Sequence, residues 1–263
     1  MLIDENVLPL IPKDGQMDVN SLLFDNSLDY EDPHYLLQYN GVPFSPLGGI
    51  QAMTGQKKNG KTFVLAQFMA AILGDGAEHL KAMLPGLKLM DDIKDYIGKE
   101  PSVLYVDTEM EHDNSAKVIR RVRWLCDAQL KGNAANFRQL WLRTTPTETR
   151  RQAVFDTIDQ MKPTCVIIDG LRDLIGDFND ITASAKLIND LMKVATDNNC
   201  CIWNVLHYNP RLNADTEDGK MRGHLGTELG NKVSDTFVCV KKKSAEGVTF
   251  TVKQQDARGK AVS

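Results

Sequence analysis

Residues 55–62 have the spacing G-x-x-x-x-G-K-[ST], in which a protein backbone can wrap around a phosphate group. The two glycines let backbone N–H groups point inward, and the start of a following helix adds partial positive charge. We expect Lys61 to reach the β- and γ-phosphates of a nucleotide and Thr62 to help hold Mg²⁺. The predicted nucleotide-binding residues are Gly55, Gln56, Lys57, Lys58, Asn59, Gly60, Lys61, Thr62 and Phe63.

The residues around this loop fit the motif. Residues 49–54 are typical of a short strand, and the apolar residues 63–73 are typical of a buried helix that stops at Gly74. A glycine turn that matched by accident would not be expected to lie between a strand and a helix. The stretch therefore predicts a site for a nucleoside triphosphate.

An acid that could coordinate Mg²⁺ follows the most apolar predicted strand, residues 164–168. Asp169 ends this strand, where such an acid is expected. The next residue is Gly170 rather than a second acid, so the base that activates water must come from elsewhere.

Glu109 is the favoured candidate for this base, because it follows another predicted strand, residues 102–106. The carboxyl ends of parallel strands meet at one edge of a sheet. In the alternative, Glu109 only starts the next helix and Asp107 or Glu111 is the functional acid.

His207 ends a further apolar stretch, residues 200–206, at the same predicted edge. Its imidazole could donate a hydrogen bond to the γ-phosphate or to the attacking water and so sense hydrolysis. A purely structural role is an equally open alternative, since a lone histidine is usually structural.

Strands and helices alternate along the chain, which predicts an α/β fold with a mostly parallel sheet covered by helices on both faces. Residues 236–240 and 248–252 predict a C-terminal hairpin that extends the sheet in the antiparallel direction. We expect residues 33–43 to join the domain as an edge strand or hairpin, residues 75–100 to form a helical excursion, and Thr147 to cap its helix. The predicted strands are 49–54, 102–106, 137–142, 164–168 and 200–206, and the predicted helices are 63–73, 114–130, 147–161 and 181–197.

Charge divides the chain into two parts. Residues 1–40 contain eight acids and one lysine, while the net charge of the whole chain is −4, so the rest is mildly basic. We predict an acidic, partly ordered N-terminal arm over residues 1–32 and one domain over residues 33–263. The acidic start does not resemble a signal peptide and no long apolar run is present, so we expect a cytoplasmic protein without a membrane partner. The five cysteines show no C-x-x-C pair and predict reduced core thiols.

Four segments carry a resemblance to a known family. They are the phosphate loop, the stretch Val103-Leu-Tyr-Val-Asp-Thr-Glu109, the stretch Val166-Ile-Ile-Asp169-Gly-Leu-Arg-Asp-Leu174 and the strand ending in His207. Together they resemble the RecA/DnaB superfamily of P-loop ATPases. Over roughly residues 40–260 the chain most resembles small hexameric plasmid replicative helicases of the RepA type and ATPases of bacterial mobile elements. The resemblance implies a RecA-like domain that uses ATP and Mg²⁺ and assembles as a ring with nucleotide at the subunit interfaces. In that family a glutamate on the strand beside the phosphate-loop strand activates water, which agrees with Glu109, and the strand-ending histidine reports the phosphate state.

The resemblance also implies contacts outside the nucleotide site. The segment after the histidine strand faces the ring channel in that family, so Arg211, Lys220 and Arg222 are candidates for contacts with single-stranded DNA. A solvated loop over residues 209–230 is an equally open alternative. Basic residues near the end of the chain reach the neighbouring subunit's nucleotide, which makes Arg258 or Lys253 a candidate trans finger.

We therefore predict a Mg²⁺-dependent ATP hydrolase that works as a homo-oligomer in the manner of a DNA helicase or translocase, and the resemblance implies a hexameric ring. Replication or mobilisation of a mobile element is the setting that the resemblance implies. Two alternatives stay open: a nucleotide-switched DNA-binding or assembly protein with little turnover, and a small-molecule kinase.

Overall fold

The computed structural model describes residues 23–74, 77–127, 136–208, 221–244, 247–259 and 261–262. These residues fall into two units, one ending at Pro33 and the other starting at His34. In the first unit the described residues form a turn at residues 26–28 and no helix or strand. The second unit contains both hydrophobic cores and all of the described helices and strands.

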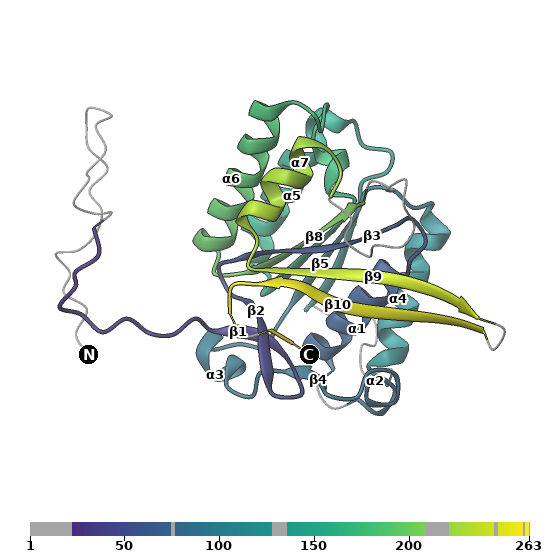
Figure 1. Ribbon diagram of the computed structural model, residues 1–263, viewed down its shortest axis with the longest axis horizontal. Helices are drawn as coiled ribbons and strands as arrows, with labels where there is room; N and C mark the ends of the chain where they lie inside the picture. Colours follow the sequence, from purple (N-terminus) through teal and green to yellow (C-terminus); the bar gives the residue numbers. More distant parts are fainter. Residues whose placement is uncertain are drawn as a thin grey trace. The chain divides into compact units, whose positions relative to one another are not determined.

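A seven-stranded sheet forms the middle layer of the second unit (Figure 1). Its strand order is β10-β9-β3-β8-β7-β5-β6, and every neighbouring pair is parallel except β9 and β10, which form an antiparallel hairpin. This arrangement confirms the predicted fold class. The strands are β3 (Ile50–Gly55), β5 (Val103–Asp107), β6 (Phe137–Trp141), β7 (Cys165–Asp169), β8 (Cys201–His207), β9 (Asp235–Ser244) and β10 (Gly247–Ala257).

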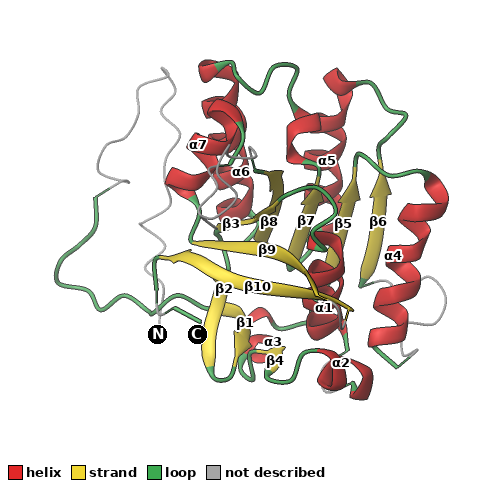
Figure 2. Cartoon of the chain, turned by 45° about the vertical axis from the view of Figure 1, so that its right-hand side comes forward, coloured by secondary structure: helices red, strands yellow, loops and turns green. Residues whose placement is uncertain are grey.

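Helices cover both faces of this sheet because its strands are apolar on both sides. In β5, Val103 and Tyr105 point into one core and Leu104 and Val106 into the other. The first core is covered by α1 (Lys61–Leu73) and α4 (His112–Leu125), as Figure 2 shows. The second core is covered by α5 (Thr147–Met161), α6 (Ile181–Asp197) and α7 (Gly223–Lys232).

A small antiparallel sheet packs beside the first core. It has the order β2-β1-β4 and contains β1 (Tyr35–Tyr39), β2 (Val42–Pro46) and β4 (Leu87–Leu89). The predicted hairpin after residue 33 is therefore confirmed, although it belongs to a sheet of its own. The predicted helical excursion contains β4 between two short helices, α2 (Glu78–Met83) and α3 (Ile93–Ile97).

Three local predictions need correction. The helix expected over residues 114–130 is α4, which begins at His112 and ends at Leu125. Thr147 is the first residue of α5 rather than its cap, because Pro146 stands at the N-cap. Part of the loop expected over residues 209–230 is helical: α7 begins at Gly223, while residues 209–220 lie outside the described part of the chain.

Close packing explains why α7 contains residues that disfavour a helix. A Cβ atom on Gly226 would lie 2.5 Å from the backbone carbon of Met221, so only a glycine fits there. Glycines that read as loop signals in the sequence are thus packing residues in the structure.

All five cysteines are buried free thiols, as predicted. Within the described residues, no helix has the length and apolar character needed to cross a membrane.

Candidate active site

The predicted phosphate-binding loop connects β3 to α1 at the carboxyl edge of the sheet. Gly55 has φ +139°, and a Cβ atom there would lie 2.4 Å from the carbonyl oxygen of Cys239, so a side chain cannot be accommodated. Gly60 is the N-cap of α1, with φ +84° and no side-chain cap. The first N–H groups of α1 therefore have no capping side chain and can bind the oxygens of a phosphate group.

The Lys61 ammonium group lies inside this loop. Its Nζ is 3.1 Å from the carbonyl oxygen of Gly55, 2.9 Å from that of Gln56 and 3.0 Å from Nδ1 of His207. Burial lowers the pKa of Lys61 from its ordinary value. Because the ammonium donates to Nδ1, a neutral His207 ring carries its proton on Nε2.

The two predicted metal residues are in direct contact. Thr62 Oγ1 donates a hydrogen bond of 2.8 Å to Oδ2 of Asp169, and the Tyr105 hydroxyl donates a second one of 2.9 Å to the same oxygen. Burial raises the pKa of Asp169, and the two hydroxyl donors oppose this shift.

These groups fit Mg²⁺, which prefers oxygen ligands and commonly binds one or two carboxylates together with substrate phosphates and water. Thr62 and Asp169 would hold the ion beside the loop. The described residues contain no cluster of three or more His, Cys, Asp or Glu side chains that could form an all-protein metal site.

Glu109 lies at the same edge, on the other side of His207. Its Oε1 is 3.7 Å from His207 Nε2, a distance that allows charge attraction but is longer than a hydrogen bond. The interaction with His207 lowers the pKa of Glu109, and about half of its side chain is exposed. His207 therefore stands between the cation of the loop and a carboxylate that is ionised at neutral pH.

The other two acids near Glu109 have structural partners. Asp107 is fully buried and accepts hydrogen bonds from the backbone N–H groups of Glu109 and Met110 in the loop before α4. Glu111 pairs with Arg143 at 2.8 Å, and this contact lowers the pKa of Glu111 to about 2. Glu109 is the acid whose carboxylate faces the site.

Strand register explains how these residues come together. Gly55 is paired with His207 between β3 and β8, and Asp107 is paired with Asp169 between β5 and β7. The expectation that the Glu109 strand lies beside the phosphate-loop strand is wrong, because β8 and β7 stand between β3 and β5. His207 ends β8, the strand next to β3, and therefore lies between the phosphate loop and Glu109.

Comparison with known proteins agrees with this fold. A family model described as an AAA domain matches residues 22–210. The chain belongs to the AAA domain family. No curated protein matches it in sequence. Among solved structures, the KaiC-like protein of the hyperthermophilic archaeon Pyrococcus horikoshii OT3 has a similar fold, with a TM-score of 0.50 and 12% identity over 82% of each chain.

Family and fold together confirm the predicted RecA-like P-loop ATPase domain. The family and the fold do not distinguish plasmid helicases from other ATPases, so the predicted resemblance to plasmid helicases stays a prediction.

This AAA domain has a basic cavity beside Glu109 and His207, with a volume of about 400 Å³. The guanidinium groups of Arg172 and Arg222 lie over the ring of Phe178, at 4.6 and 5.7 Å from its centre. Arg222 was predicted as a nucleic-acid contact, whereas Arg211 and Lys220 lie outside the described residues. The cationic residues that line the cavity are Lys57, Arg143, Arg150, Arg172 and Arg222.

Several of these functional candidates could not be assigned from the sequence. Tyr105 stands in a strand of aliphatic residues, and that contrast is the only sequence signal of its contact with Asp169. Arg143, Arg150 and Arg172 lie 7 to 29 residues apart along the chain, and only the fold brings them to one cavity.

The two candidate trans fingers lie on β10 and directly after it. The Arg258 guanidinium donates to the carbonyl oxygens of Asn231 and Lys232, at 3.4 and 3.2 Å, and so caps the end of α7. Lys253 lies on β10 and lines an apolar cavity on the α1 side of the sheet. Their role toward a neighbouring subunit stays a prediction.

Proposed function

We propose that this AAA domain protein is a Mg²⁺-dependent ATP hydrolase that works as a homo-oligomer on single-stranded DNA. The observation that carries the proposal is the row of contacts from Glu109 through His207 to Lys61, next to the Thr62–Asp169 pair. This row places a base, an imidazole, a phosphate-binding cation and a metal pair at one edge of the sheet. Replication or mobilisation of a mobile element is the setting that we propose from the resemblance.

In the proposed mechanism, the loop N–H groups bind the phosphates and Lys61 leaves its two carbonyl partners to contact the β- and γ-phosphates. When bound, Mg²⁺ would supply positive charge at the phosphate oxygens, held there by Thr62 and Asp169. Glu109 orients a water molecule for in-line attack and takes up its proton, because its carboxylate is ionised and partly exposed.

His207 senses the phosphate state in this mechanism. Without nucleotide, its Nδ1 accepts from Lys61 and its Nε2 faces Glu109. When Lys61 turns to the phosphates, His207 loses this donor and can contact the γ-phosphate or the water instead. The partner of Glu109 therefore changes with the occupancy of the loop.

The basic cavity supports a nucleic-acid partner. Within the described residues, no carboxylate pairs with Arg172 or Arg222, so both can contact phosphate groups of a strand. Arg211 and Lys220, which lie outside the described residues, stay candidate contacts on the resemblance alone. A strand bound there would lie against Glu109 and His207, which links DNA binding to hydrolysis.

The test is ATP hydrolysis by the purified protein with and without single-stranded DNA. We expect DNA to stimulate the wild type. Glu109→Gln should retain ATP binding and lose about 10²–10³-fold in rate, and Asp169→Asn should need far more Mg²⁺. Glu111→Gln is the matched control and should hydrolyse ATP near the wild-type rate, because its carboxylate is paired with Arg143 and does not line the cavity beside Glu109.

Two results would contradict the proposal. Normal hydrolysis by Glu109→Gln would remove the assigned base. Labelled phosphate that appears on an added hydroxyl compound rather than in water would indicate a kinase.

A nucleotide-switched assembly or DNA-binding protein is the second candidate. It is favoured by the position of Lys61, whose ammonium is already bound by two carbonyl oxygens and a histidine. Slow hydrolysis that does not respond to DNA, together with assembly that depends on ATP, would support this candidate over a motor.

A further inference from the structure

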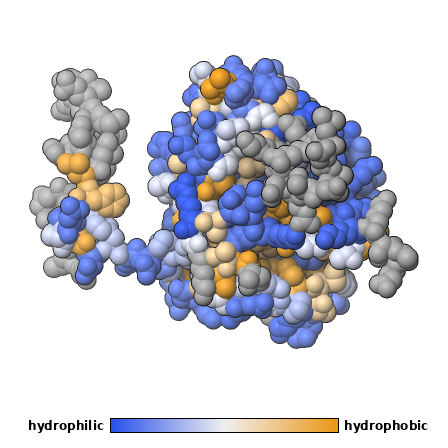
Figure 3. All heavy atoms as spheres, viewed as in Figure 1, coloured by the Kyte–Doolittle hydropathy of each residue, from blue (hydrophilic) through white to orange (hydrophobic). Residues whose placement is uncertain are grey.

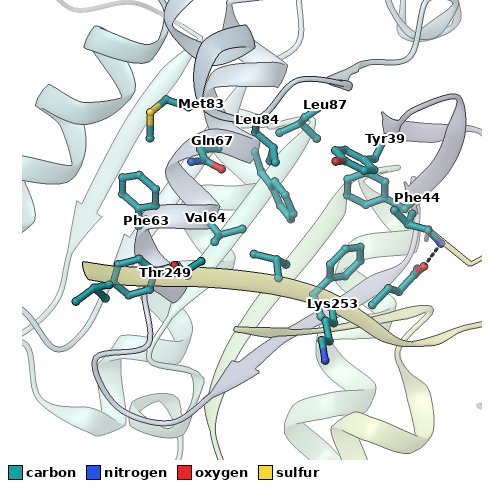
Figure 4. A pocket seen from close by; sticks show the side chains of 17 residues that line it. Tyr39, Phe44, Phe63, Val64, Gln67, Met83, Leu84, Leu87, Thr249 and Lys253 are labelled. Atoms are coloured by element: carbon teal, nitrogen blue, oxygen red, sulfur yellow. Dashed lines mark hydrogen bonds between the residues drawn. The ribbon is translucent and has the colours of Figure 1, made fainter. Parts of the chain in front are cut away.

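An apolar groove of 740 Å³ lies between α1, α2, the small sheet and the β9–β10 hairpin. Figure 4 shows Tyr39 and Phe44 toward one end of it and Met83, Phe63 and Thr249 toward the other. In Figure 3 hydrophobic surface gathers along this side, below the hairpin. Its polar lining is limited to Gln67, Thr249, Lys253 and Gln254.

The rim of this groove exposes large hydrophobic side chains. Met83 is 42% exposed, Val248 51% and Phe250 43%. These residues come from two separate elements, α2 and β10, and Figure 4 shows Met83 toward the same end of the groove as Thr249, which stands between Val248 and Phe250 in β10. Contiguous apolar surface at a concave site is typical of a protein contact.

The first unit of the chain carries a matching set of side chains. Leu23 is 67% exposed, Phe24 76%, Leu28 58% and Tyr30 55%. Four large apolar residues within eight positions are unusual in an acidic segment. They form no part of either hydrophobic core.

This segment is locally ordered around an aromatic pair. The rings of Phe24 and Tyr30 meet edge to face at 5.0 Å. Asp25 N–H donates to the Tyr30 hydroxyl at 2.8 Å, and Leu28 N–H donates to the Asp25 carbonyl oxygen at 3.1 Å. A segment that already holds its shape loses less conformational entropy when it binds.

Charge also matches. Residues 23–33 contain four acids and no base. The hairpin that borders the groove carries Lys241, Lys242 and Lys253, and Lys241 lies 5.5 Å from the centre of the Phe250 ring. Opposite charges at the rim favour the acidic segment over a neutral one.

We propose that residues 23–30 of one copy of this chain dock into the apolar groove of a second copy. The aromatic pair of Phe24 and Tyr30 enters the end lined by Met83 and Val248, and the neighbouring acids face the lysines of the hairpin. The proposal rests on the homo-oligomer of the proposed function and names the contact that builds it.

Chain length favours a second copy over the same copy. Residues 31–33 join Tyr30 to His34 and span at most about 14 Å. Along β1 the distance from His34 to Tyr39 is already about 17 Å, and α2 and the hairpin tip lie farther on, away from the start of β1 (Figure 1). Since Phe24 packs on Tyr30, both rings share this short tether to the start of β1, which favours the groove of a second copy.

The test uses three full-length variants that change only exposed side chains. The arm variant is Phe24→Ser with Tyr30→Ser, and the groove variant is Met83→Ser with Val248→Ser. The control is Ile181→Ser, which removes a side chain that is 61% exposed on α6. Molar mass is measured by light scattering over a range of protein concentrations with a non-hydrolysable ATP analogue.

We expect the arm and groove variants each to need at least about tenfold more protein to assemble than the wild type, and the control to assemble like the wild type. An equal mixture of the two variants should form a dimer that neither forms alone, because an intact arm meets an intact groove. A labelled peptide of residues 23–33 should bind the arm variant and not the groove variant.

The outcomes separate this proposal from the proposed function. Wild-type assembly that both variants retain would overturn the docking contact and leave the oligomer in place. A wild type that stays monomeric at every concentration would remove both. A mixture that gains no dimer, with peptide binding intact, would place the arm in the groove of its own chain and overturn docking between copies.

Discussion

Tyr105→Phe tests the most specific contact in the site, because it removes one hydroxyl group and leaves the ring in place. Tyr105 is fully buried, and its hydroxyl donates at 2.9 Å to the Asp169 oxygen that also accepts from Thr62. A hydrogen bond to a charged group contributes about 1.5–3 kcal/mol to stability. Phenylalanine fills the same space, so no cavity term adds to this loss.

We therefore expect Tyr105→Phe to lower the free energy of unfolding by about 1.5–3 kcal/mol at neutral pH. The loss depends on pH, because the hydroxyl stabilises the ionised carboxylate. Asp169 has a folded-state pKa above its ordinary 3.8, and without the hydroxyl this pKa rises further. The deficit should thus be largest above this raised pKa and shrink as the pH falls through it, before the ordinary range of an aspartate is reached.

The same substitution should weaken metal binding, since Asp169 keeps only Thr62 as its partner. We expect the Mg²⁺ concentration for half-maximal hydrolysis to rise about tenfold, with a smaller change in kcat at saturating Mg²⁺. Urea denaturation at several pH values and Mn²⁺ binding by electron paramagnetic resonance measure the two effects. Tyr39→Phe, in β1 away from Asp169, is the matched control. Unchanged stability and metal affinity in Tyr105→Phe would show that the hydroxyl does not stabilise the Asp169 carboxylate.

Two further substitutions test the phosphate loop. Lys61→Met should abolish hydrolysis and weaken ATP binding measured by calorimetry. It should not lower thermal stability without nucleotide, because it removes a buried cation whose burial already lowers its pKa. A large loss of stability would show that the carbonyl and His207 contacts of Lys61 outweigh its desolvation. Gly55→Ala should lower the free energy of unfolding by at least about 2 kcal/mol, since the new Cβ would meet the Cys239 carbonyl oxygen. Denaturant melts of Gly98→Ala provide the control for backbone strain alone, because Gly98 is a left-handed glycine with open space around it.

The parts of the site that could be predicted from the sequence are those set by local pattern. The phosphate loop is one uninterrupted motif between a strand and a helix. Asp169, Glu109 and His207 each follow an apolar run, and parallel strands bring their carboxyl ends to one edge. Locating these residues required only the end of each strand, which apolar runs mark well.

The lateral order of the strands could not be predicted in this way. The position of β5 depends on which strand packs beside which, and these pairings join residues up to 152 positions apart. Apolar runs such as those of β5, β7 and β8 are alike in composition, so the sequence does not distinguish their neighbours. The strand order was therefore expected from the resemblance, and it was wrong.

Helix α7 was missed for a related reason. Local propensity argues against a helix with Gly223, Gly226 and Gly230, and it would be right for an isolated peptide. In the fold, Leu225 and Leu229 of the same segment are fully buried in the second core, and Gly226 lets the helix approach Met221. Burial of apolar side chains outweighs the cost of the glycines, which only tertiary contacts reveal.

The strand order also bears on the proposed mechanism. If β5 lay directly beside β3, Glu109 would face the loop with no group between them. With β8 and β7 inserted, the pairing of Gly55 with His207 places the imidazole between Lys61 and Glu109. One ring then contacts the cation that leaves when ATP binds and the carboxylate that must hold water.

Since the contact of Lys61 with Nδ1 fixes the tautomer that faces Glu109, release of Lys61 frees the ring to change partner. Binding of the phosphates and readiness of the base are thus coupled through His207, and His207→Ala should separate them: ATP affinity should be retained while the difference in hydrolysis rate between DNA-free and DNA-bound protein is lost.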